Sequence, residues 1–225
     1  MSLQPKLQKR LRAAIKHFWI TRETQAQKQG GVSGSKDAGS RAAVTGGAQM
    51  NGFINLVRDL LCEGGLAKAH VFCEKYIELP GWYRPEKKWD LLIVSDKKLL
   101  AGIEFKSQVG PSFGNNYNNR TEEAIGSATD IWAAYREGAF EPSARPWLGY
   151  LMLLEEGPRS VAPVRAREPH SKCSRNSKMP LTRSATRFCL RNLFGSGSTM
   201  LRVSSCPMRR TDQGCISRTG TGVEL

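Results

Sequence analysis

The sequence predicts an α/β domain built around a mixed β-sheet. Two short apolar runs, 89–95 and 99–105, are joined by a short charged connection, which is typical of a β-hairpin. The clearest helical pattern of the chain follows at 121–137, and a short buried-strand pattern comes next at 148–154. The order strand, strand, helix, strand is that of an α/β sheet with a mixed core.

The composition favours a polyanionic partner. The 225 residues are enough for one sizeable domain and an appendage, and the net charge of +14 favours nucleic acid over an anionic membrane. The longest clear apolar run, 148–154, is too short to span a bilayer. Lys16 and His17 interrupt the stretch 11–20, which argues against a secretory signal. We therefore expect a cytoplasmic protein without a membrane partner.

The cysteines and histidines form no metal-binding or disulfide pattern. None of the six cysteines has C-x-x-C spacing, and the three histidines lie far apart in the sequence. Both a zinc site and a disulfide framework are therefore poorly supported.

The first region, residues 1–28, carries an amphipathic basic helix. Apolar residues recur at helical spacing over 3–20, and lysines and arginines cover much of the remaining surface. A solvated basic face is favoured over contact with DNA phosphates. Residues 29–48 are rich in Gly, Ser and Ala without any period, so we expect a flexible loop.

A second helix is predicted at 51–63, where apolar residues form one face and Gly64-Gly65 ends the pattern. Asp59 and Glu63 lie on its polar side. Either acid could contribute to a metal site, but a solvated pair is the favoured interpretation.

Residues 71–79 predict a strand that leads to the Pro80-Gly81 turn. Glu74 and Glu78 in this strand are further candidate acids, and exposure to solvent is again the favoured interpretation for both.

The hairpin at 89–105 contains charged residues inside apolar runs. If its turn is the three residues 96–98, Ser95 faces Leu99. Counting outward then places Asp90 directly opposite Glu104. Two carboxylates would therefore converge on one side of the hairpin.

Lys106 adds an amine to this pair of acids. It lies two residues after Glu104, so the two side chains share one face of the strand. Charges buried in a strand are costly unless they are paired or bind a metal. A salt-bridged edge hairpin and a metal site are both open at this point.

A polar segment at 109–120 follows the hairpin. Asparagine and arginine side chains can read adenine and guanine in the major groove, but Asn and Gly also favour simple turns. Turn chemistry is the better interpretation of the segment by itself. Its position directly after the charged strand adds support to DNA contact. The candidate base-reading residues are Asn115, Asn116, Asn118, Asn119 and Arg120.

Asp90 and the run Glu104-Phe105-Lys106, in a strand–strand–helix–strand setting, resemble the PD-(D/E)xK nuclease fold. The segments KKWDLLIVSDKKLLAGIEFKSQVGPSFGNNYNNR, EEAIGSATDIWAAYREG and MNGFINLV resemble the XhoI-type type II restriction endonucleases more specifically. The resemblance covers about the first three quarters of the chain and stops near His170. No proline directly precedes Asp90. The proline is the part of the motif that contributes least to the chemistry, so its absence puts little in doubt.

The resemblance implies a restriction-endonuclease-like fold with a central mixed sheet flanked by helices. It implies Mg²⁺-dependent cleavage of both strands of the palindrome CTCGAG in a bacterial restriction–modification system, with a DNA methyltransferase as functional partner. A palindrome matches a C2 homodimer on double-stranded DNA.

The residue chemistry agrees with this activity, because Mg²⁺ binds carboxylates and activates water for phosphodiester cleavage. Asp90, Glu104 and the Phe105 carbonyl are the expected metal ligands. Asp90, Glu104 and Lys106 are the expected catalytic residues. Lys106 would orient the attacking water or help deprotonate it, and would stabilise the phosphate. Gln108 is expected to support the site or to reach a base.

The final segment, 171–225, differs from the core predicted at 49–170. It has no sustained period and carries ten basic residues against two acidic ones. We favour a frameshift that replaced the C-terminal part over a genuine disordered DNA-binding tail. Two alternative functions remain open for the whole chain: a catalytically inactive DNA-binding remnant, and a structure-specific repair nuclease of the same fold.

Overall fold

The structure is a computed structural model that describes residues 5–30, 47–110, 113–156, 160, 170 and 198–204. The chain divides into two compact units, Met1–Cys73 and Glu74–Leu225. The division lies inside the range 49–170 predicted as one core. Of the predicted flexible loop 29–48, residues 31–46 lie outside the described residues.

The first unit contains helix α1 (Pro5–Gly30), helix α3 (Asn51–Glu63) and strand β1 (Val71–Phe72), with short 3-10 helices at Ala48–Met50 and Lys68–His70. Helix α3 has the predicted bounds. Helix α1 is longer than the predicted 3–20. Its extension over 21–29 holds Arg, Glu, Gln, Ala and Lys, which favour helix without continuing the apolar stripe.

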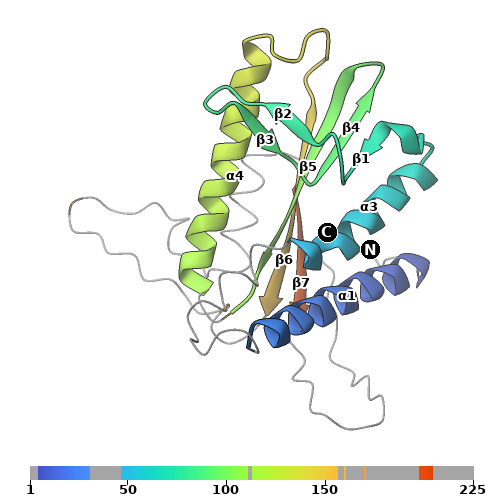
Figure 1. The fold of residues 1–225 in the computed structure, drawn as a ribbon, viewed down its shortest axis with the longest axis vertical. Coiled ribbons are helices and arrows are strands. Elements are labelled where there is room, and N and C mark those ends of the chain that lie inside the picture. Colours follow the sequence, from blue (N-terminus) through green and yellow to red (C-terminus); the bar gives the residue numbers. More distant parts are fainter. Residues whose placement is uncertain are drawn as a thin grey trace. The chain divides into compact units, whose positions relative to one another are not determined.

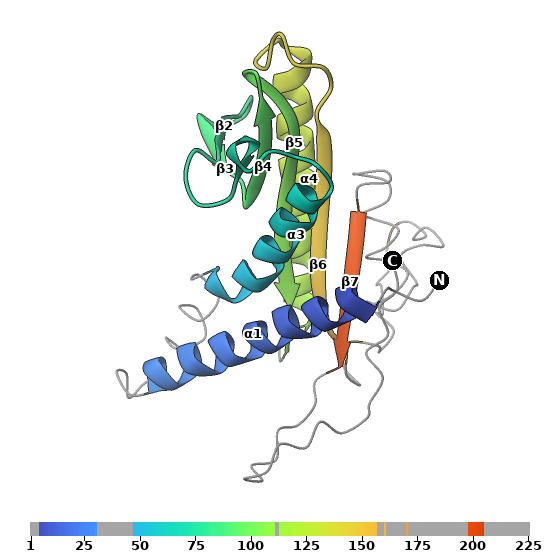
Figure 2. The same ribbon diagram turned by 90° about the vertical axis from the view of Figure 1, so that its right-hand side faces the viewer.

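Helices α1 and α3 pack against each other through a close approach at Gly52 (Figure 2). A Cβ atom at Gly52 would lie 3.2 Å from the Ala14 Cα atom, a tight contact that would require a shift of a few tenths of an ångström. Arg10 of α1 forms ion pairs with the α3 acids Glu63 (2.9 Å) and Asp59 (3.6 Å). These acids therefore serve a surface ion-pair cluster, in line with the favoured interpretation.

The second unit is organised around the neighbouring strands β4 (Leu91–Ser95), β5 (Lys98–Gln108), β6 (Trp147–Glu156) and β7 (Ser198–Ser204). Strands β4 and β5 are antiparallel, whereas β5, β6 and β7 are parallel. The predicted α/β fold with a mixed central sheet is confirmed. Strands β5 and β6 are mostly buried, as expected for central strands that are covered on both faces.

Helix α4 (Phe113–Arg136) connects β5 to β6 and runs along one face of the sheet (Figure 1). The predicted apolar stripe is confirmed at Ala124, Ala128 and Ile131, which are buried. Gly138, with φ of 81°, follows the helix and turns the chain.

The start of α4 corrects the prediction of a polar loop over 109–120. The helix begins at Phe113 and not at the predicted residue 121. Asn and Gly favour turns over helix, which made the local pattern misleading. The first turn is anchored by tertiary contacts instead: Phe113 is buried, and the Gln108 side-chain amide donates to its carbonyl at 2.9 Å.

The predicted strand 71–79 is also wrong as a single element. Tyr76 has φ of 58°, a left-handed conformation that interrupts an extended chain. A separate antiparallel hairpin follows, formed by β2 (Glu78–Pro80) and β3 (Glu86–Lys88). Glu74 and Glu78 are exposed, which agrees with the favoured interpretation of both acids.

Strand β7 lies within the predicted tail 171–225, where no element was expected. It pairs in parallel with β6, with Thr199 opposite Leu151 and Met200 opposite Met152. The rest of this tail lies outside the described residues. Across the part of the chain that the structure describes, no helix is long and apolar enough to cross a membrane.

Candidate active site

The hairpin that carries the candidate site has a tighter turn than predicted. Asp96 and Lys97 both have positive φ, 50° and 63°, which is the signature of a two-residue type I′ turn. Ser95 therefore pairs with Lys98, and the predicted pairing of Ser95 with Leu99 is wrong.

A bulge restores the predicted register closer to the site. Val94 pairs with Leu99 but Ile93 pairs with Ala101, so Leu100 is an extra residue on β5. Leu91 then lies opposite Ile103, and the next step outward brings Asp90 into line with Glu104. The predicted convergence of the two acids therefore holds, although the turn that produces it differs.

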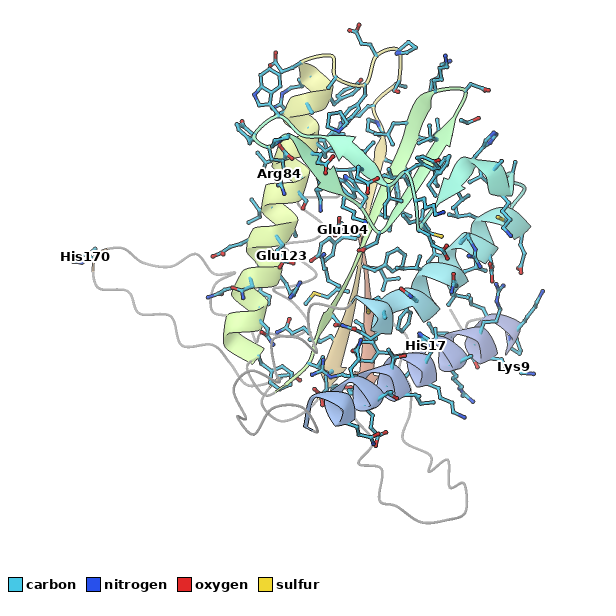
Figure 3. The ribbon with its side chains drawn as sticks, in the orientation of Figure 1. Lys9, His17, Arg84, Glu104, Glu123 and His170 are labelled. Atoms are coloured by element: carbon cyan, nitrogen blue, oxygen red, sulfur yellow. The ribbon has the colours of Figure 1, made fainter. Side chains whose placement is uncertain are left out.

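Glu104 is the centre of the charged cluster. Its side chain is 2% exposed on β5, and Figure 3 shows it in the middle of the sheet. The Lys106 Nζ atom lies 2.9 Å from Glu104 Oε2, and the Lys87 Nζ atom lies 2.6 Å from Oε1. Both carboxylate oxygens therefore face an ammonium group. Lys106 was predicted to lie here, whereas Lys87 was missed because its strand, β3, was not recognised.

Asp90 lies immediately before β4 and contacts β5 through the backbone. Its Oδ2 atom accepts a hydrogen bond of 2.7 Å from the Phe105 amide. Burial and the nearby charge of Glu104 raise the pKa of Asp90, whereas Lys106 and the Phe105 amide oppose the rise. Among the described residues, no hydrogen bond or ion pair reaches the other oxygen, Oδ1.

The Phe105 carbonyl points toward the same side as Asp90. In an extended strand, the amide and carbonyl of one residue face the same neighbour, and the Phe105 amide already faces Asp90. The ladder partner expected for this carbonyl is the Trp89 amide, which instead donates to the Ile77 carbonyl at 2.9 Å. The carbonyl of Phe105 is thus placed to act as a ligand beside the two carboxylates.

Lys106 is a protonated amine in this environment. Burial alone would lower its pKa, but the charges of Glu104 and Asp90 outweigh burial and raise the pKa above the usual lysine value. In the metal-free site, Lys106 is therefore a cation that can pair with a carboxylate or a phosphate.

The oxygen donors of the site fit Mg²⁺. The structure brings no three His, Cys, Asp or Glu side chains together as a metal cluster within its described ranges. Mg²⁺ does not require one, because it takes one or two carboxylates and keeps several waters. Asp90, Glu104 and the Phe105 carbonyl supply donors of this kind. Burial and the charge of Glu104 raise the pKa of Asp90, and a cation bound beside it would favour its ionised form.

The residues predicted to contact DNA have different environments. Gln108 is buried and bonded to the Phe113 carbonyl, so its geometry is that of a supporting residue. Asn116 donates to the Val109 carbonyl at 3.2 Å. Asn118 and Asn119 are exposed on the first turns of α4.

Two further candidates complete this set. Arg120 is half-buried and forms an ion pair with Glu123 one turn further along α4. The side chain of Asn115 lies outside the described residues. A role of these polar residues in base reading stays a prediction.

A second buried carboxylate, Asp130 of α4, was missed. Its Oδ1 atom accepts from the amides of Trp82 (2.9 Å) and Tyr83 (2.8 Å), and its Oδ2 atom pairs with Arg84 at 2.8 Å. Figure 3 shows Arg84 beside α4. An acid within the apolar stripe of the helix was the signal that could have revealed it. Asp130 fastens the tip of the β2–β3 hairpin, and β3 carries Lys87.

A sequence profile of the family described as restriction endonuclease XhoI matches residues 27–185. The chain belongs to the XhoI restriction endonuclease family. The match includes Asp90, Glu104 and Lys106. It extends past His170, where the resemblance was expected to stop, and ends inside the predicted tail.

Three curated type II restriction enzymes are similar to the chain. It is 56% identical to type II restriction enzyme BstVI of Geobacillus stearothermophilus over 140 residues, 60% of this chain and 62% of that protein. Identity to AbrI of Azospirillum brasilense is 48%, covering 76% of this chain and 77% of AbrI. Identity to XhoI of Xanthomonas vasicola is 42%, covering 71% of this chain and 64% of XhoI.

The chain thus spans less than two thirds of the length of BstVI and of XhoI. No solved structure matches the chain.

Proposed function

We propose that this chain is a type II restriction endonuclease that cleaves both strands of double-stranded DNA with Mg²⁺. The convergence of Asp90, Glu104 and Lys106 on one hairpin supports this proposal most directly. The relatives that share this stretch are named type II restriction enzymes. All three residues also lie within the matched range of the family profile.

Asp90, Glu104 and the Phe105 carbonyl would hold the Mg²⁺ ion. A bound ion would lower the pKa of a water molecule and would neutralise charge on the phosphate. The chain itself contributes a preorganised set of oxygen atoms, from Glu104 and Phe105 on the buried strand β5 and from half-buried Asp90 just before β4. Because the pKa of Lys106 is raised, we assign it the stabilisation of phosphate charge in preference to deprotonation of the water.

The proposed substrate is the palindrome CTCGAG, and the proposed assembly is a C2 homodimer in which each subunit meets one half-site. A DNA methyltransferase that protects the same sequence would be the functional partner in a bacterial restriction–modification system. Exposed Asn118 and Asn119 on α4 are proposed to face DNA.

Incubation of the purified full chain with a plasmid that carries one CTCGAG site tests the activity. We expect a single linear product with Mg²⁺ and none with EDTA, and a plasmid with the site changed to CTCGTG should stay intact. Smeared or branch-dependent products would contradict the proposal in favour of a repair nuclease.

The alternative is an inactive DNA-binding remnant of such an enzyme. It is favoured by the segment 171–225, whose sequence has no sustained periodicity. A mobility shift of the CTCGAG duplex without any cleavage would support it. The frameshift proposed for the tail is tested separately, by sequencing the coding DNA around codons 165–180. A reading frame that no single-base shift improves would contradict it.

A further inference from the structure

Lys87 is a second lysine at the candidate active site, and it reaches Glu104 from a different strand. Lys106 lies on β5 with Glu104, whereas Lys87 comes from β3 of the separate two-stranded sheet. Its Nζ atom is 2.6 Å from Glu104 Oε1, and its side chain is only 14% exposed. A divalent cation that binds Glu104 must therefore approach a carboxylate that already carries a cation on each oxygen.

The four charges of the site sum to zero without any metal. Asp90 and Glu104 contribute two negative charges, and Lys87 and Lys106 contribute two positive charges. A carboxylate as buried as Glu104 would be costly without such partners. Lys87 thus supplies positive charge that a bound divalent cation would otherwise supply.

The ammonium group of Lys87 has a second favourable contact, with the ring of Trp89. The Nζ atom lies 4.9 Å from the centroid of the Trp89 ring, a favourable cation–π distance. The buried Trp89 ring packs on Gly102, where an added Cβ atom would come within 3.2 Å of it. The indole is therefore a fixed platform, and Lys87 can leave the carboxylate while it stays over the ring.

We propose that Lys87 is the resident counter-ion of Glu104, which occupies Oε1 in the metal-free protein and is displaced when a divalent cation binds. The inference rests on the proposed function, because it concerns the same carboxylate. Lys87 is a positioning residue that stabilises the empty site, and its positive charge opposes metal binding. Metal affinity should therefore rise when this charge is removed.

The test measures binding of Mn²⁺ to the DNA-free full chain by electron paramagnetic resonance, with Mg²⁺ as competitor. Lys87→Gln removes the charge but keeps a donor for Oε1, and we expect roughly tenfold tighter Mn²⁺ binding because the repulsion is lost. Lys87→Arg keeps the charge, so its affinity should stay close to that of the wild type.

Lys88→Gln is the matched control. Lys88 follows Lys87 on β3, but its side chain is 68% exposed and pairs with Glu78 at 3.7 Å. Its removal changes the net charge equally without touching Glu104, so Mn²⁺ affinity should change by no more than about twofold because water and salt screen the charge. In a Glu104→Gln background, the gain from Lys87→Gln should disappear.

Unchanged or weaker Mn²⁺ binding by Lys87→Gln would overturn the inference, as would failure of the wild type to bind Mn²⁺. A direct readout in the wild type does not depend on the folding of that variant. Mg²⁺ should shift the ¹⁵N signal of the Lys87 Nζ atom, assigned with Lys87→Arg, and an unshifted signal at saturating Mg²⁺ contradicts displacement. Plasmid cleavage by the wild type decides the proposed function separately.

Discussion

Two buried carboxylates in the second unit have very different partners. Asp130 accepts from two backbone amides and also pairs with Arg84, so directed donors occupy both of its oxygens. Among the residues that the structure describes, Glu104 pairs with the ammonium groups of two lysine side chains. Backbone donors cannot leave without unfolding the hairpin, whereas a lysine head can move. Burial by itself thus does not mark a reactive acid, and we propose that the backbone donors of Asp130 suit a structural role, whereas the side-chain partners of Glu104 suit a metal ligand.

The largest expected effect comes from Glu104→Ala. Cleavage of CTCGAG DNA should be abolished because a proposed metal ligand is lost, whereas binding of the duplex should persist. Plasmid cleavage and a mobility-shift assay measure the two properties, and circular dichroism checks the fold. Asp59→Ala is the control, since Asp59 is a half-exposed acid of the first unit, and its cleavage should remain normal. Cleavage by Glu104→Ala at the wild-type rate would refute the site assignment.

Asp130→Ala should instead lower stability. It leaves the amides of Trp82 and Tyr83 without their acceptor and removes the partner of Arg84. We expect a loss of about 2–4 kcal/mol in the free energy of unfolding, measured by urea denaturation. The same substitution at half-exposed Asp59 should cost less than about 1 kcal/mol. Equal losses at the two positions would contradict a structural role specific to Asp130.

Asp90→Asn tests the sign of the electrostatics in the metal-free site. Because burial and Glu104 raise the pKa of Asp90, its ionisation destabilises the folded state at neutral pH. The variant should therefore melt at a higher temperature than the wild type near pH 7 in EDTA. The gain should shrink as the pH falls through the raised pKa of Asp90 and vanish below the ordinary aspartate pKa, where both states hold the proton. A lower melting temperature at neutral pH would contradict this account.

The smallest effect is expected for Gln108→Met. The substitution removes the hydrogen bond to the Phe113 carbonyl, but it also removes Oε1, a buried oxygen for which the described residues provide no hydrogen bond. These terms oppose each other, so unfolding free energy should change by less than about 1 kcal/mol. The preference for cleaving CTCGAG over sites that differ from it by one base pair should be unchanged. A weaker preference would show that Gln108 reads a base.

Several features were predictable because they depend on local periodicity. The bounds of α3 and the strand pattern of 148–154 follow from apolar spacing over one element. The opposition of Asp90 and Glu104 was also predicted, but through two errors that cancelled. A two-residue turn replaced the expected three-residue turn, and the extra residue Leu100 compensated for it.

Other features depend on contacts between distant segments. The start of α4 at Phe113 depends on a buried ring and on the Gln108 amide, not on local helix propensity. The β2–β3 hairpin has mixed charge and little apolar alternation, so its strands gave no periodic signal. Strand β7 lies in a segment without sustained periodicity and is defined by its pairing with β6.

The order of residues alone determined that two acids and a lysine share one hairpin, because the period of two along a strand is a local property. It also carried the family resemblance that the comparisons confirmed. Only the tertiary structure decided which partners the buried acids meet. The amides that bind Asp130 lie 47 and 48 residues away in sequence, and Lys87 reaches Glu104 from another sheet. Such partners are brought together by packing, and no spacing within a single element can reveal them.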